Sequence, residues 1–163
     1  MTITTSGKER IAKPMEDFSS AFLRLALGVS FLSAVGDRFG FWGPFGQSHV
    51  SWGDFSHFTA YTAKLNWFMP SAAIPVLAWA STCAETLLGV ALLVGWFTRV
   101  AAALSGLLLF LFALVMTFAL GLEAPLSASV FSASAGAFLL ATCSKYPWSL
   151  DSFWVEETHG ARR

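Results

Sequence analysis

The chain has 163 residues, of which 55% are hydrophobic and only 12% are charged, and its mean hydropathy is +0.61. A soluble domain usually carries about a quarter charged residues, so this composition excludes an ordinary water-soluble surface and indicates a membrane protein. The formal net charge is zero, which argues against the basic surface of a nucleic-acid-binding protein. Since each crossing of a bilayer takes roughly 20 apolar residues, the length allows four crossings and one sizeable loop.

The chain begins with a polar segment, residues 1–17, which we expect in the cytoplasm. An apolar stretch over residues 18–36 follows and predicts the first membrane span. A cleaved signal peptide is the alternative for this start, but its apolar core would be shorter, about 7–15 residues. Such a core would also rarely hold an arginine, and this stretch contains Arg24. The sequence therefore favours a permanent span.

Residues 37–69 form the one long loop of the predicted structure. The loop is rich in aromatic residues and is interrupted by glycines and Pro44. Within it, five residues recur at helical spacing and predict a short amphipathic helix at the membrane surface. These residues are Phe55, Phe58, Tyr61, Thr62 and Leu65.

Three further apolar stretches, residues 70–94, 100–120 and 126–143, predict the remaining spans, and residues 144–163 predict a cytoplasmic tail. The connections between these spans are only a few residues long, so consecutive spans must be antiparallel neighbours. The predicted fold is thus all-α: an integral membrane four-helix bundle over residues 18–143, with one long aromatic-rich outer loop.

The orientation follows from the distribution of lysine and arginine, which accumulate on the cytoplasmic side of a membrane protein. One side of the predicted spans, which holds both termini, carries Lys8, Arg10, Lys13, Arg99, Lys145, Arg162 and Arg163. The other side carries Arg38 and Lys64. We therefore expect a multi-pass protein of the bacterial inner membrane with both termini in the cytoplasm.

Two charged residues, Arg24 and Glu85, lie inside predicted spans, where ionised groups are costly and normally face the interior of the bundle. Counted along the helices, their depths differ by about 6 Å, which predicts an ion pair between them. Helical side chains tilt toward the N-terminus of their own helix, and this tilt carries the two groups apart. Three roles are therefore open for Glu85: a structural pair, contact with a ligand such as a quinone, or proton transfer. Arg24 has the alternative of extending to the membrane surface.

Several polar residues surround the predicted outer loop. Asp37 and Arg38 directly follow the first span, where they would form a local ion pair or a helix cap. His49, Asp54 and His57 lie further along the loop. Their spacing matches no metal-binding motif, so hydrogen-bonded loop residues are the favoured interpretation and no metal site is predicted.

The stretches RLALGVSFLSAVGDRFG at residues 24–40 and AETLLGVALLVGWFTRVAA at 84–102 resemble the DoxX/DoxD family of small bacterial membrane proteins. The resemblance implies a four-helix bundle, and some of that family's members are small membrane subunits of a thiosulfate:quinone oxidoreductase. By motif position it implies that Arg24, Asp37, Glu85 and Arg99 contact a bound quinone or form structural ion pairs.

We see no haem, flavin or iron–sulfur motif, so no intrinsic cofactor is expected and a quinone is the one bound cofactor considered. The leading hypothesis is an accessory membrane subunit of a larger respiratory or redox-linked complex, in contact with lipids and with other membrane subunits or copies of itself. A quinone-linked oxidoreductase subunit with Arg24 and Glu85 near the quinone is the first alternative. A homo-oligomeric transporter of small solutes is the second, and it is disfavoured because no inverted repeat is visible.

Overall fold

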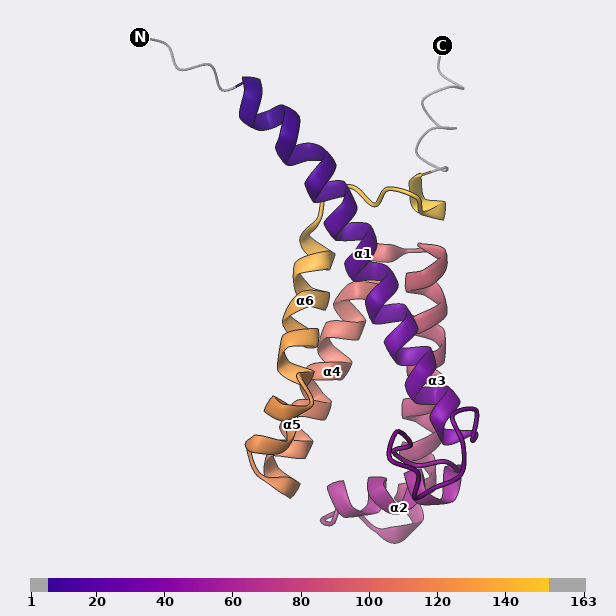
Figure 1. Ribbon diagram of the computed structural model, residues 1–163. Coiled ribbons are helices and arrows are strands. Elements are labelled where there is room, and N and C mark those ends of the chain that lie inside the picture. The colour runs from indigo at the N-terminus through magenta and orange to yellow at the C-terminus, as the bar shows by residue number, and fades with distance from the viewer. Residues whose placement is uncertain (1–5, 153–163) are drawn as a thin grey trace.

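The computed structural model describes residues 6–152 of the chain, with side chains from Pro14 onward. Every regular element in this part is a helix, as the all-α prediction requires. In chain order the elements are α1 (Ser6–Arg38), α2 (Phe55–Leu65), the 3₁₀ turn η1 (Ser71–Ala73), α3 (Ile74–Val94), α4 (Thr98–Leu120), α5 (Glu123–Ser127) and α6 (Val130–Thr142) (Figure 1). Arg162, Arg163 and the side chains of Lys8, Arg10 and Lys13, all used in the orientation argument, lie outside this description.

Three segments of the described chain are long and apolar enough to cross a membrane. They are Pro14–Arg38, Ser71–Val94 and Thr98–Leu120. The protein is therefore a multi-pass membrane protein. Helix α6 is also apolar but has only 13 residues. At 1.5 Å per residue it is about 20 Å long, which is less than the roughly 30 Å of a bilayer's hydrocarbon core.

The segment that was expected to form one continuous fourth helix is divided. The chain leaves helical geometry at Ser129, whose φ of 55° lies in the left-handed region, and this residue separates α5 from α6. Serine hydroxyl groups compete for backbone hydrogen bonds and favour turns over helix interiors. Two further serines, Ser127 and Ser132, flank Ser129. A prediction from hydropathy alone does not detect this preference of serine for turns, and it therefore gave one continuous helix.

The helices pack in two main pairs, α1 with α3 and α4 with α6, and α3 also contacts α4 (Figure 1). Helix α2 lies across one end of the molecule, where it contacts α3 and α4. We call this the α2 end. The opposite end holds the turn between α3 and α4 and the described residues that follow α6, and we call it the Gly95 end.

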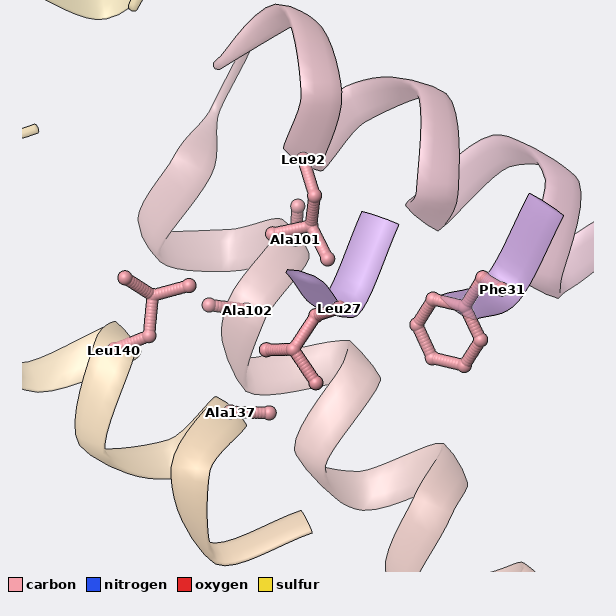
Figure 2. Close-up of a cluster of buried hydrophobic side chains, with 7 residues drawn as sticks. All are labelled: Leu27, Phe31, Leu92, Ala101, Ala102, Ala137 and Leu140. Atoms are coloured by element: carbon pink, nitrogen blue, oxygen red, sulfur yellow. The ribbon is translucent and has the colours of Figure 1, made fainter. Parts of the chain in front are cut away.

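Four helices contribute to one hydrophobic core near the Gly95 end (Figure 2). Its members come from α1, α3, α4 and α6, and many of them are small, which allows the helix backbones to approach closely. They are Leu27, Phe31, Leu92, Ala101, Ala102, Ala137 and Leu140. Packing between α4 and α6 is reinforced by Ser134, which donates a buried hydrogen bond of 2.8 Å to the carbonyl oxygen of Gly106.

Candidate functional site

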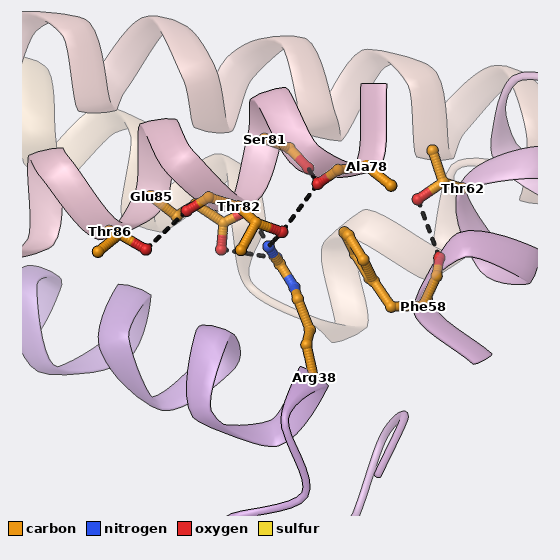
Figure 3. Close-up of polar contacts among 8 residues, drawn as sticks. All are labelled: Arg38, Phe58, Thr62, Ala78, Ser81, Thr82, Glu85 and Thr86. Atoms are coloured by element: carbon orange, nitrogen blue, oxygen red, sulfur yellow. Dashed lines mark hydrogen bonds and ion pairs between the residues drawn. The ribbon is translucent and has the colours of Figure 1, made fainter. Parts of the chain in front are cut away.

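A buried ion pair joins α1 to α3 near the α2 end (Figure 3). The Nη2 atom of Arg38 lies 2.6 Å from Oε1 and 2.7 Å from Oε2 of Glu85, and it donates to both oxygens. Nη1 of Arg38 donates to the hydroxyl group of Thr82 at 2.8 Å, one helical turn before Glu85. The exposed fractions of Arg38 and Glu85 are 3% and 2%. Both charges are therefore withdrawn from solvent and satisfied mainly by each other.

The direction of helical side chains explains why these two residues meet. Helices α1 and α3 run in opposite directions, and each side chain tilts toward the N-terminus of its own helix. Arg38 lies in the last turn of α1, at the α2 end, and its side chain tilts toward the Gly95 end. The side chain of Glu85 tilts the other way, toward the α2 end, where α3 begins. The same tilt that separates Arg24 from Glu85 thus brings Arg38 and Glu85 together.

Aromatic rings from α2 and the preceding loop cover the arginine. Cζ of Arg38 lies 3.7 Å from the centroid of the Phe58 ring and 5.4 Å from that of Trp52. A cation over an aromatic face is attracted by the ring's quadrupole, most strongly where water is excluded. Phe58 is itself buried and its ring packs edge-on against Trp52. Helix α2 is therefore attached to the membrane helices through the guanidinium group.

Asp37 positions the loop that carries Trp52. Its Oδ2 accepts hydrogen bonds from the backbone amides of Ser51 at 3.0 Å and Trp52 at 2.9 Å. Its Oδ1 has no hydrogen-bond partner among the described residues, although Asp37 is buried. The local ion pair with Arg38 that the sequence suggested is not the contact that forms. Asp37 binds the loop backbone, while Arg38 reaches α3.

Asp54 caps the start of α2. Its Oδ1 accepts from the backbone amide of His57 at 2.9 Å, and its Oδ2 lies 2.7 Å from Nδ1 of the same residue. These two hydrogen bonds lower the pKa of the exposed Asp54 carboxyl group below its ordinary value. The His57 ring also stacks on Phe45, with 3.8 Å between the ring centroids. This cap fixes the helix that supplies Phe58.

The predicted ion pair between Arg24 and Glu85 is wrong. Arg24 lies near the middle of α1, at the level of the Gly95 end of the molecule, where its Nη2 donates to the carbonyl oxygen of Trp148 at 2.6 Å. Fourteen residues separate Arg24 from Arg38, which is about 21 Å along a helix. The prediction measured depth from the edges of the apolar stretch, and these edges do not coincide with the ends of α1. Arg24 is level with the α3–α4 turn rather than with Glu85.

The other predicted site residues are distributed between the two ends. Asp37 and Glu85 lie at or near the α2 end, whereas Arg99 lies at the Gly95 end and donates to the carbonyl oxygen of Cys143 at 3.1 Å. The four residues therefore do not form one site. Within the described residues, no group of three or more His, Cys, Asp and Glu side chains could hold a metal ion.

The central role of Arg38 was missed from the sequence. The tilt rule already disfavoured Arg24 as the partner of Glu85, and it points toward a cation at the C-terminal end of the first span. Arg38 occupies that position. It was interpreted as a loop residue because hydropathy alone ended the first span at residue 36, two residues too early.

These features define a multi-pass, all-helical membrane protein whose helices are joined by buried charges. The sequence profile described as "Methylamine utilisation protein MauE" matches residues 16–135, and the chain belongs to that family. This match corrects the resemblance to the DoxX/DoxD family, whose quoted stretches lie within the matched range. No curated protein sequence and no solved structure matches the chain significantly.

Proposed function

We propose that this protein is an accessory membrane subunit that serves a redox-linked enzyme system of methylamine utilisation. The observation that carries this proposal is the family match over residues 16–135, which extends from α1 into α6 and covers the three long apolar segments except for the first two residues of Pro14–Arg38. An accessory role means that the protein anchors, assembles or supports an enzyme whose chemistry other subunits perform.

The use of the charged groups inside the helices supports an accessory role. Glu85 accepts from Arg38 with both oxygens, and Arg24 is buried against the backbone of Trp148. Charged side chains with such contacts hold helices and loops together. This structural role is the one expected of a subunit or an assembly factor. Contact between a quinone and these residues stays a prediction. A single pocket formed by Arg24 and Glu85 is not supported, because Arg24 on α1 lies at the Gly95 end, whereas Glu85 on α3 lies near the α2 end.

A strain that lacks this gene is expected to lose growth when methylamine is its required nutrient. The reason is that an enzyme system without its membrane subunit would not assemble or would not deliver electrons. Growth rates with methylamine and with ammonium plus an unrelated carbon source, measured for the deletion strain and for the strain complemented in trans, check this expectation. Equal growth of the deletion and complemented strains on methylamine would overturn the proposal.

We also propose four membrane crossings with both termini in the cytoplasm. The fourth crossing would be made by α5 and α6 together, and the exposed irregular residues 128–129 between them would lie toward the headgroup region, because lipid does not accept an unsatisfied irregular backbone. Arg24 at the Gly95 end adds to the positive charge on the side assigned to the cytoplasm, which supports this orientation. The outer loop and α2 then face the opposite compartment.

Reporter fusions test this orientation. A reporter that is active only in the cytoplasm should be active when fused after Arg163, and one that is active only outside should be active when inserted at Gly46. Gly46 suits the insertion because a Cβ atom there would meet no neighbour within 4 Å. The reverse pattern, or activity of the same reporter at both positions, would show that the number of crossings or the orientation is wrong.

A further inference from the structure

The chain that follows α6 is tied back onto the Gly95 end. Asp151 accepts from the backbone amides of Phe97 at 2.9 Å and Thr98 at 2.7 Å, which are the N-cap residue and the first residue of α4. The backbone amide of Asp151 in turn donates to the carbonyl oxygen of Gly95 at 3.0 Å. Together with the contact from Arg24 to Trp148, these bonds attach residues 146–152, which we call the strap, to α1, α3 and α4.

Gly95 provides the space into which the strap fits. Its φ of 74° lies in the left-handed region, which glycine adopts at little cost. A Cβ atom at this position would collide with Nη1 of Arg24 and with Cβ and Cα of Ser149. Ser149 is 1% exposed. The turn, the strap and Arg24 are therefore packed against one another without room for a side chain at residue 95.

Two bulky residues at this end adopt an unfavourable backbone conformation. Phe97 has a φ of 47° and Trp148 a φ of 52°, in the left-handed region that large side chains normally avoid. Each is held there by one of the bonds described above: Asp151 binds the amide of Phe97, and Arg24 binds the carbonyl group of Trp148. Such backbone strain persists only where the surrounding contacts impose it. The strap is thus a fastened segment rather than a loose continuation of α6.

This backbone geometry turns aromatic side chains outward. The exposed fractions are 56% for Trp96, 63% for Phe97 and 72% for Trp148. Trp96 and Phe97 lie at the junction of two membrane helices, and their apolar surface continues that of the exposed neighbours Val94 and Val100. A surface at the end of membrane helices is level with the headgroup region, where the amphipathic tryptophan ring is favoured.

We propose that the strap is anchored in the lipid headgroup region at the Gly95 end, with Trp148 as its lipid contact and with Arg24 and Asp151 as its attachments to the helices. The lipid surface is the occupant that fits, because Trp148 is exposed at the same end of the apolar helices as Trp96 and Phe97, whose rings pack edge-on against each other at the junction of α3 and α4. Arg24 is then explained by its position: it fixes the strap at the depth where Trp148 meets the headgroups. This inference depends on the membrane location of the protein and not on its proposed function.

Fluorescence of Trp148 in lipid nanodiscs tests the proposal. All other tryptophans are replaced by phenylalanine, and quenching is measured with phosphatidylcholines brominated near the headgroup or near the end of the acyl chain. We expect stronger quenching by the shallow bromines. Asp151→Ala in the same background should weaken this quenching and shift the emission to longer wavelength, because the strap loses its attachment to α4. Glu123→Ala is the matched control, since within residues 6–152 Glu123 accepts only a local hydrogen bond, from Ser127, near the α2 end.

Limited proteolysis of the protein with its natural tryptophans gives a second, independent readout. Trypsin cleavage after Lys145 should be about tenfold or more faster in Asp151→Ala than in the unaltered protein or in Glu123→Ala, because two hydrogen bonds to a charged carboxylate are lost. Absence of quenching by shallow bromines in the folded protein would overturn the lipid contact, and a water-exposed or protein-covered Trp148 would then be established. Equal quenching and equal cleavage in Asp151→Ala would overturn the fastening role of Asp151.

Discussion

Replacing Arg38 or Glu85 with leucine is expected to cost about 3–5 kcal/mol of folding free energy, because removal of one partner leaves the other charge buried and unpaired. Glu85→Leu should be the more damaging change. It leaves a guanidinium group that cannot lose its proton, whereas Arg38→Leu leaves a carboxylate that can take one up. Thermal unfolding in mild detergent, together with the amount of folded protein in the membrane, measures both losses.

The double variant Arg38→Leu/Glu85→Leu should be more stable than either single variant, since replacing both charges with apolar groups can be nearly neutral. The resulting double-mutant cycle isolates the coupling between the two side chains. Arg24→Leu is the matched control on the same helix. Its effect should add to that of Glu85→Leu without coupling, because Arg24 contacts the strap instead. If Arg38 and Glu85 give simply additive losses, the ion pair does not hold α1 to α3.

A conservative variant separates charge from geometry at this position. Arg38→Lys keeps the positive charge, but an ammonium group does not reproduce the planar fork that reaches Glu85 and Thr82 while stacking on Phe58. An intermediate stability is therefore expected. Stability equal to that of the unaltered protein would mean that charge alone is needed, and the contacts to Thr82 and Phe58 would carry little weight.

Sequence reasoning identified Glu85 as a residue that needs a partner, and it did so from one physical fact, the cost of a charge within lipid. It chose the wrong partner because hydropathy locates the apolar part of a helix and not its ends. Helix α1 begins at Ser6 and continues to Arg38, beyond the apolar stretch on both sides. An error of a few residues at each edge was enough to place Arg24 at the wrong depth.

Local patterns were reliable where local forces decide the structure. The helical spacing of aromatic residues predicted a short helix that is present as α2, Phe55–Leu65. The strap could not be predicted in this way, because Asp151 and Phe97 meet only through the tertiary arrangement. The family assignment failed for a related reason: apolar helices share composition across unrelated families, so short apolar stretches discriminate poorly between them.

Helices α1 and α3 approach each other closely at two glycines, Gly28 and Gly89. A Cβ atom on Gly28 would lie 2.9 Å from the carbonyl oxygen of Gly89 and 2.8 Å from Cγ of Leu93. A Cβ atom on Gly89 would lie 3.2 Å from the carbonyl oxygen of Gly28 and 3.1 Å from Cγ of Leu32. Membrane helices gain little from burying apolar groups against each other and depend on such close backbone packing. The two glycines therefore keep the backbones of α1 and α3 near each other, and the ion pair between Arg38 and Glu85 joins the same two helices.

Gly28→Ala is expected to destabilise the protein by about 1–3 kcal/mol, the usual cost of overpacking, because a backbone carbonyl cannot move aside as a side chain can. Gly89→Ala should cost less, since its contacts are longer, and leucine at either position should separate α1 from α3. Gly136→Ala is the matched control, as its added Cβ would lie 3.3 Å from Cδ1 of Leu23, a flexible side-chain end. Thermal unfolding in detergent ranks the three alanine variants. If Gly28→Ala is as stable as Gly136→Ala, the two helices do not approach at these glycines, and the ion pair must be held by other contacts.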